Sequence, residues 1–147
     1  MESIKIKEIF ITDPEYGGVY ELRETLLRRP IGLSLENEDL SADRSDHILA
    51  ATVGEKVIAC IMLQPRGGDI IKFRQMAVAS AWQGKDVGMA LLRYAEAFAK
   101  EKNYRQVVLH ARVSAEGFYQ KAGYRNSSDI FTEVGIDHVL MEKSLNP

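Results

Sequence analysis

The sequence predicts an α/β domain in which a mixed β-sheet carries helices on its faces. Two apolar runs joined by Gly54-Glu55, and a third that follows the turn at Gly67-Gly68, indicate β-hairpins in the first half. An amphipathic helical stripe between two apolar runs indicates a β-α-β crossover in the second half, which requires parallel strands. The chain has 147 residues, 46% of them hydrophobic and 27% charged, which is typical of one globular domain.

The N-terminal third contains a predicted strand and a predicted helix. Residues 3–11 are rich in apolar and β-branched side chains and read as the strand. Asp13 and Pro14 are expected to open the helix, with aspartate as its N-cap and proline at its first position. Apolar residues continue at helical spacing until residues 29–32, which contain a proline and a glycine. Residues 33–46 are polar and acidic, and we expect a loop or a short helix.

The middle of the chain supplies three strands and the best-defined helix. Residues 47–53 and 56–63 are predicted to pair as a hairpin, and residues 70–78 to form the next strand. Apolar side chains then recur at intervals of three and four residues, which predicts a helix over residues 88–102.

The C-terminal part continues with shorter elements. Residues 106–110 form an apolar strand and residues 114–122 a helix, which Gly123 ends in a left-handed conformation. Two strands, at about residues 124–133 and 138–143, close the chain.

Composition and charge exclude several classes of protein. The net charge of −2 argues against a nucleic-acid binder that depends on bulk positive charge. No apolar run approaches the ~20 residues that cross a bilayer, and the first ten residues contain no signal-peptide core. The single cysteine, Cys60, permits no internal disulfide, and it is more typical of a core position than of a nucleophile. The histidines show no metal-site spacing. We therefore expect a soluble, cytoplasmic protein without nucleic-acid, membrane or metal partners.

A glycine-bearing loop precedes the helix at 88–102. Residues 82–90 read WQGKDVGMA. Such a loop exposes backbone N–H groups at a helix N-terminus, where they and the helix dipole bind phosphate. The spacing fits neither a Walker A loop nor GxGxxG. An ordinary tight turn between strand and helix is the alternative.

This loop resembles motif A of the GCN5-related N-acetyltransferase (GNAT) superfamily, which reads Gln/Arg-x-x-Gly-x-Gly/Ala. Gln83 and Gly88 match its first and last positions, whereas Asp86 stands at the middle glycine. Aspartate tolerates a left-handed backbone better than most residues. Its carboxylate would repel a diphosphate, so we expect weaker cofactor binding or a carboxylate turned outward toward Lys85.

A second segment extends the resemblance. Residues 110–124, HARVSAEGFYQKAGY, resemble motif B in the pattern Phe-Tyr-x-Lys-x-Gly-aromatic. The beginning of this segment and residues 131–138 resemble the ElaA/YjcF-like branch of the superfamily. Similarity spans about residues 47–143, and residues 1–46 fit in element order. It implies one N-acetyltransferase domain over residues 1–147, with a mostly antiparallel, twisted sheet of about seven strands and helices on both faces.

The resemblance also implies a co-substrate, acetyl-CoA, whose acetyl group passes directly to an amine without an acyl-enzyme. It places the thioester carbonyl and the pantetheine arm along strand 70–78, near Met76, Ala77 and Val78. A β-bulge there would free an N–H for the tetrahedral oxyanion. It places the pyrophosphate on the amides of Gln83, Gly84, Lys85, Asp86, Val87, Gly88, Met89 and Ala90.

Acid and base candidates follow from the same resemblance. Tyr119 would protonate the leaving CoA thiolate, because a phenol of pKa ~10 keeps its proton at neutral pH; the alternative is that it packs the helix onto the sheet. His110 ends a strand beside the expected thioester and would be a base, or a buried structural histidine. Arg112 replaces an asparagine that contacts the cofactor arm in relatives. It could pair with a CoA phosphate or an acidic substrate, or be solvated.

Further base candidates lie near the C-terminus, and a water chain could replace a dedicated base. They are Glu133, Asp137 and His138.

Three functional hypotheses remain open from the sequence. The first is an acetyl-CoA-dependent N-acetyltransferase. The second is a CoA-binding module of the same fold without turnover, motivated by Asp86 and the missing asparagine. The third is an unrelated nucleotide-binding domain that would prefer ATP or NAD.

The acceptor is open as well. Ten acidic residues and four arginines lie between Asp13 and Glu55, which would suit a cationic small-molecule or peptide amine such as a polyamine, aminoglycoside, lysine or protein N-terminus. A homodimer is plausible for this fold.

Overall fold

The computed structural model describes residues 3–145. Its helices are α1 (Tyr16–Arg23), α2 (Val87–Glu101) and α3 (Glu116–Lys121). Its strands are β1 (Ile4–Ile9), β2 (His47–Val53), β3 (Lys56–Gly67), β4 (Ile70–Val78), β5 (Gln106–Arg112), β6 (Arg125–Asn126), β7 (Phe131–Glu133) and β8 (Ile136–Ser144).

Hydrogen bonds join the strands in the order β1-β2-β3-β4-β5-β8-β6, and β7 also pairs with β8. β4 and β5 are parallel, whereas β1–β2, β2–β3 and the pairs that β8 makes are antiparallel. The mixed, mostly antiparallel sheet predicted from the sequence is therefore confirmed. Within residues 3–145 it has eight strands rather than about seven.

The chain forms two compact units. One comprises Met1–Gln64 with Gln75–Ala95, and the other Pro65–Arg74 with Glu96–Pro147. Each unit draws on two stretches of sequence, so neither is a contiguous part of the chain.

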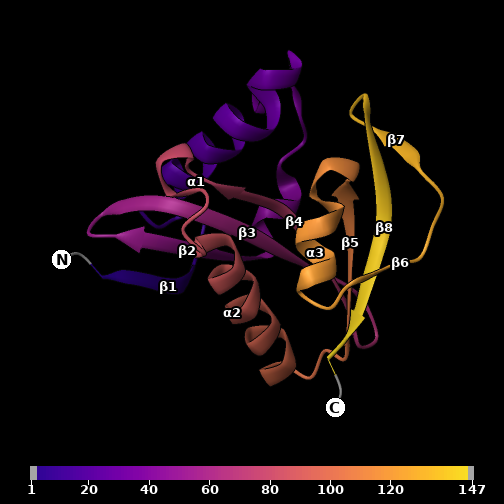
Figure 1. Ribbon diagram of the computed structural model, residues 1–147. Helices are drawn as coiled ribbons and strands as arrows, with labels where there is room; N and C mark the ends of the chain where they lie inside the picture. Colours follow the sequence, from indigo (N-terminus) through magenta and orange to yellow (C-terminus); the bar gives the residue numbers. More distant parts are fainter. Residues whose placement is uncertain (1–2, 146–147) are drawn as a thin grey trace. The chain divides into compact units, whose positions relative to one another are not determined.

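The first unit is built on β1, β2 and the first part of β3, with α1 packed on them (Figure 1). β2 is buried after His47, and β3 is buried over residues 57–63, in agreement with the apolar runs there. Their hairpin turns at Gly54, whose φ of 59° is left-handed. The core cluster of this unit comprises residues of these elements and Ala77 of β4: Ile9, Val19, Ile48, Ala50, Val57, Cys60, Met62 and Ala77.

The first helix begins later than predicted and changes its geometry before it ends. It begins at Tyr16 after an N-cap at Glu15, because the Asp13 carboxylate instead accepts the backbone N–H of Phe10 (2.8 Å) and closes a turn. After Arg23 the helix widens into a π turn, Glu24–Arg28, before a short 3₁₀ turn. The prediction that Asp13 and Pro14 open the helix is therefore wrong. The stop near residue 32 is confirmed, since Gly32 is left-handed with φ 75°.

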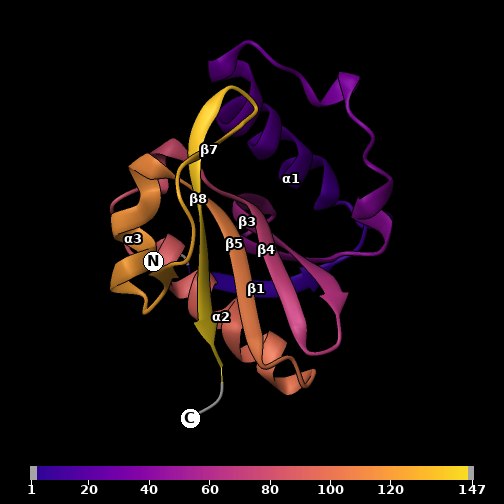
Figure 2. The same cartoon turned by 90° about the vertical axis from the view of Figure 1, so that its right-hand side faces the viewer.

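The second unit centres on β5, which lies between β4 and β8 (Figure 2). Its residues alternate between buried and half-buried, as expected for a strand with two unlike faces. The single strand predicted over residues 124–133 is wrong. Ser127, Ser128 and Asp129 interrupt it: Ser128 Oγ accepts the N–H of Leu140, and the Ser127 N–H bonds the carbonyl of Leu140. Short polar side chains thus replace part of the strand ladder.

No helix in the described part of the chain is long and apolar enough to span a membrane.

Candidate active site

β4 contains an unusual backbone conformation next to the residues where the family resemblance would put the thioester. Gln75 has φ 55°, a left-handed value inside a strand. Non-glycine residues adopt this region at a cost, and such outliers concentrate at functional sites. Directly after it, Met76 and Val78 are half-buried and Ala77 is buried. Cys60 of β3 contacts this point, with Sγ 3.6 Å from the Gln75 carbonyl. Cys60 is fully buried, and burial raises the pKa of its thiol to about 12, which confirms a core role.

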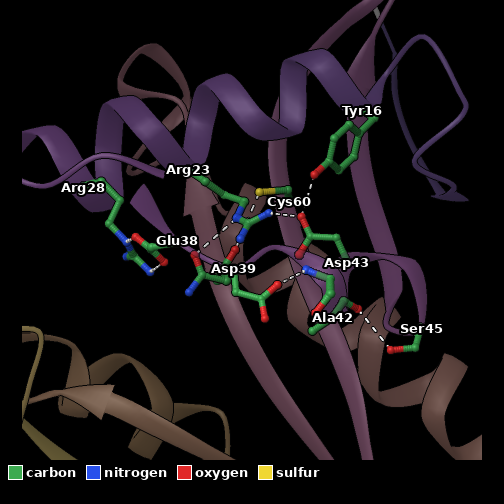
Figure 3. Close-up of polar contacts among 11 residues, drawn as sticks. Tyr16, Arg23, Arg28, Glu38, Asp39, Ala42, Asp43, Ser45 and Cys60 are labelled. Carbon is green, nitrogen blue, oxygen red and sulfur yellow. Dashed lines mark hydrogen bonds and ion pairs between the residues drawn. The ribbon is translucent and has the colours of Figure 1, made fainter. Parts of the chain in front are cut away.

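A buried ionic network holds the Gln75 side chain. Arg23 Nε donates to Gln75 Oε1 (3.3 Å), and Arg23 Nη1 donates to Asp43 Oδ2 (2.7 Å). The hydroxyl of Tyr16 donates to the same Asp43 oxygen (2.6 Å), so the three side chains converge as Figure 3 shows. Arg23 and Asp43 are 1% and 3% exposed. Burial, followed by the hydrogen bond to the Asp43 carboxylate, raises the pKa of Tyr16 to about 12.

Sequence reasoning did not identify this network, although one signal was present. Arg23 follows Val19 by four residues and therefore lies on the apolar face of α1. A charged residue at a buried helical position requires a partner. The partner, Asp43, is twenty residues away in a 3₁₀ turn (Ser41–Arg44) of the segment expected to be a loop or a short helix, and no local pattern links it to Arg23. A neighbouring pair, Arg28 and Glu38, repeats the arrangement with a more exposed carboxylate (Figure 3).

The loop after β4 has the backbone expected of a phosphate cradle. Gly84 and Asp86 both have left-handed φ angles, 75° and 64°. The Asp86 carbonyl accepts the N–H of Ala90 (3.0 Å), the first hydrogen bond of α2. The first N–H groups of a helix have no partner within the helix, and here they lie next to a loop whose residues 83–86 are exposed. Val87 is buried and anchors the loop, and Gln83 Nε2 donates to the Val78 carbonyl (2.9 Å).

The other loop residues are placed as follows: Gln83, Gly84, Lys85, Asp86 and Ala90 are exposed, and Gly88 and Met89 are half-buried. The left-handed conformation expected of Asp86 is confirmed. The Lys85 ammonium lies 5.5 Å from the centre of the Trp82 ring, a cation–π contact, and within residues 3–145 it makes no ion pair with Asp86. The two side chains therefore form no ion pair, and a carboxylate turned outward remains one of the two expectations for Asp86.

In the second unit, Tyr119 lies half-buried on α3. Its ring makes edge contacts with Phe118 (5.1 Å between centroids) and Tyr124 (5.7 Å). Burial raises the pKa of Tyr119 to about 12. The phenol therefore keeps its proton at neutral pH.

Tyr124 is fixed by a buried ionic group. Its hydroxyl donates to Glu96 Oε2 (2.8 Å), and Lys143 Nζ donates to both Glu96 oxygens (3.1 Å each) and to the Ala122 carbonyl (2.8 Å). Gly123, left-handed at φ 99° as predicted, packs against the end of Lys143. The end of α3 is thereby tied to β8 and to the last turns of α2. Tyr119 contacts this group through the ring of Tyr124.

His110 and Glu133, two of the residues singled out in the sequence, meet in the structure. His110 Nδ1 lies 2.9 Å from Glu133 Oε1, and the imidazole is 30% exposed. Burial alone would raise the pKa of Glu133, but the His110 hydrogen bond and the charges of His110, His138 and Lys72 outweigh it and lower the pKa. Glu133 is therefore a carboxylate at neutral pH. Its hydrogen bond to Nδ1 fixes the orientation of the His110 ring, and Nε2 is the other nitrogen of that ring.

The remaining candidates surround this pair. His138 is buried, its Nδ1 donates to the Ile136 carbonyl (2.8 Å), and its Nε2 is 3.7 Å from Glu133 Oε2. Arg112 is half-buried at the end of β5 and faces His138 in the strand register. Asp137 is exposed on β8. The structure thus brings His110, Glu133 and His138 together.

A hollow of about 650 Å³ in the second unit is lined by none of the candidate catalytic or cofactor-binding residues. It is lined mainly by charged side chains, among them Arg105 and Arg125. Arg125 already pairs with Glu142 (2.7 Å).

Known proteins resemble this chain in sequence and in fold. The family model of the acetyltransferase (GNAT) domain matches residues 24–145. A Bacillus subtilis protein that carries the name "putative acetyltransferase" is 33% identical over 148 residues, which cover 95% of this chain and 96% of that protein. With another Bacillus subtilis relative the chain shares 35% identity over 79 residues, and it spans about half (53%) of that relative's length.

Two solved structures have the same fold. Escherichia coli ElaA superposes with a TM-score of 0.83 at 15% identity, covering 96% of this chain and 99% of its own. A GNAT family acetyltransferase from Elizabethkingia anophelis, with acetyl-CoA bound, gives 0.72 at 24% identity, over 96% and 97%. The resemblance of residues 82–90 and 110–124 is thereby confirmed, and an unrelated nucleotide-binding domain is excluded. The chain belongs to the GNAT family of acetyltransferases.

Proposed function

We propose that the protein transfers an acetyl group from acetyl-CoA directly to a primary amine. The observation that carries this proposal is the exposed loop at the start of α2, in which Gly84 and Asp86 adopt left-handed conformations. Consecutive backbone N–H groups in such a turn form an anion-binding concavity that suits a diphosphate. Support comes from the Elizabethkingia anophelis relative, which holds acetyl-CoA. A buried, single cysteine fits action in the cytoplasm.

The reaction requires two proton transfers. An ammonium of pKa ~10 must lose a proton before it attacks the thioester carbonyl, and the departing CoA thiolate must gain one. We assign the second role to Tyr119, whose raised pKa keeps the phenol protonated until the thiolate forms. We assign the first to His110, because Glu133 orients its imidazole and the ring is partly exposed to solvent. The backbone of Met76–Val78 and the side chain of Arg112 would bind the cofactor arm.

A thermal-shift titration with acetyl-CoA, CoA, ATP and NAD tests the cofactor. A ligand at 100 times its dissociation constant stabilises the folded state by about 2.7 kcal/mol. For a chain of this size the melting temperature should rise by about 5–11 °C. We expect this rise with acetyl-CoA and CoA and not with ATP or NAD. No rise with either CoA species would contradict the proposal.

An amine screen then tests the chemistry. Released CoA thiol is measured with acetyl-CoA and a panel that contains a polyamine, an aminoglycoside, lysine and a peptide with a free N-terminus. The acidic segment before residue 56 favours cationic acceptors of this kind. Turnover that depends on one of these amines is the expected result.

Asp86 motivates a second candidate, a CoA-binding GNAT domain without turnover. The backbone of Asp86 forms part of the proposed diphosphate-binding turn. Its carboxylate would repel a diphosphate that bound there. The variant Asp86→Gly separates the two candidates, because glycine keeps the left-handed conformation and removes the charge. A large gain in turnover would identify a degenerate natural site, whereas efficient turnover by the natural chain would exclude the second candidate.

A further inference from the structure

The left-handed residue in β4 requires an explanation beyond the strand itself. Gln75 is neither glycine nor asparagine, and its φ of 55° lies in a region that L residues avoid. In a free chain, an L residue populates its ordinary conformations about 5–30 times more than the left-handed one. Other contacts must therefore hold Gln75 in place.

Those contacts come from the Arg23 network. Arg23 reaches Gln75 Oε1 from α1, and Asp43 holds the guanidinium from the 3₁₀ turn at Ser41–Arg44. Tyr16 adds a second donor to Asp43. All three side chains of the contact, Arg23, Asp43 and Gln75, belong to one compact unit.

A buried ion pair of this type is poorly explained by stability alone. Removing two charges from water costs about as much as their attraction returns, so an apolar pair of similar volume would stabilise a core at least as well. Buried ionic groups are better attested as devices that fix one conformation among several. Here the conformation in question is that of Gln75.

We propose that Arg23 and Asp43 are positioning residues, which hold Gln75 left-handed and thereby set the direction of the backbone at Met76–Val78 toward the thioester of acetyl-CoA. This inference rests on the proposed function. It assigns a role in substrate positioning to α1 and to the 3₁₀ turn at Ser41–Arg44. From the sequence, these parts resembled the family only in the order of their elements.

The test compares two matched substitutions, each of which neutralises the carboxylate of an arginine pair in the same region. Asp43→Asn disrupts the pair that reaches β4, and Glu38→Gln disrupts the Arg28 pair, which does not. Dissociation constants for acetyl-CoA and for CoA are measured by calorimetry on each full-length variant. We expect Asp43→Asn to weaken acetyl-CoA binding about 5- to 30-fold, the factor set by the left-handed conformation, and CoA binding less than about threefold. Glu38→Gln should change neither.

A second pair of variants distinguishes the positioning role from a general loss of stability in Asp43→Asn. Gln75→Leu keeps the size of the side chain and removes the acceptor of the Arg23 hydrogen bond, so it should reproduce the selective loss. Gln75→Gly combined with Asp43→Asn should restore acetyl-CoA binding in part, because glycine adopts positive φ readily.

The outcomes separate the inference from the function on which it rests. Natural protein that binds neither acetyl-CoA nor CoA would refute the proposed function. Natural protein that binds both equally, or folded Asp43 and Gln75 variants whose ratio of the two affinities is unchanged, would overturn the positioning role while leaving the proposed function intact.

Discussion

Replacing Lys143 by methionine tests the buried group that supports Tyr124 and, through it, Tyr119. The Lys143 ammonium donates to both oxygens of Glu96 and to the Ala122 carbonyl. Methionine fills a similar volume but donates nothing, so the Glu96 carboxylate would lose its ammonium partner and keep the hydrogen bond from the Tyr124 hydroxyl. Removing one partner of a fully buried pair costs about 3–5 kcal/mol. The side chain of Lys143 is 21% exposed and that of Glu96 10%, so we reduce this cost to about 2–3 kcal/mol.

The assay is guanidinium unfolding followed by circular dichroism, with a thermal melt in parallel. The expected loss corresponds to a fall in melting temperature of about 4–12 °C for a chain of this length. Arg125→Gln is the control, because the Arg125 side chain is 80% exposed and its ion pair contributes only about 0–1 kcal/mol. Adding Glu96→Gln to the Lys143 variant should recover much of the loss, since the buried carboxylate charge that lost its ammonium partner is then removed. A single variant within about 1 kcal/mol of the natural protein would refute the reasoning.

Three further predictions concern the proposed site. Tyr119→Phe should lower kcat by about 100-fold or more and leave acetyl-CoA affinity unchanged, because it removes a donor used in the transition state; an unchanged kcat would reduce Tyr119 to a packing role. Gly88→Glu should abolish CoA binding measured by calorimetry, since it sets charge and bulk against the diphosphate, and normal affinity would show that the phosphate loop lies elsewhere. Glu133→Gln should destabilise the fold by less than about 1 kcal/mol at pH 7, because the side chain is 43% exposed. The folded-state pKa of Glu133 lies below its ordinary 4.5, so this stabilisation is present above pH 4.5 and disappears as the pH falls through the lowered value. Unfolding curves at neutral and acidic pH check the sign, and a difference that grows in acid would contradict it.

Local patterns predicted most of the fold. β2 and β4 coincide with the predicted ranges 47–53 and 70–78, because apolar runs and glycine turns encode strands within a few residues. The errors arose where short polar side chains had two uses. The Asp13 carboxylate serves a turn instead of a helix cap, and Ser128 bonds the backbone of β8 where a longer strand was expected.

The candidate site was predictable only where it depends on local backbone. The left-handed conformation of Asp86 follows from its place in the glycine-bearing loop. In contrast, the Arg23–Asp43–Gln75 contacts join three segments that only the tertiary fold brings together. The contact of Lys85 with Trp82 likewise depends on a small difference in free energy between two nearby partners, which spacing does not encode.

The π turn after α1 has a consequence for how the chain tolerates changes in length. In a π turn residues i and i+5 are linked, so Arg23 and Arg28 both point inward although they are five residues apart. Deleting the exposed Thr25 would leave them four residues apart, which in an ordinary α-helix again places both on one face. A loss of one residue would rotate every later side chain in a regular helix, yet here it would preserve both arginine pairs. Relatives that lack one residue at this point can therefore keep the same ionic contacts.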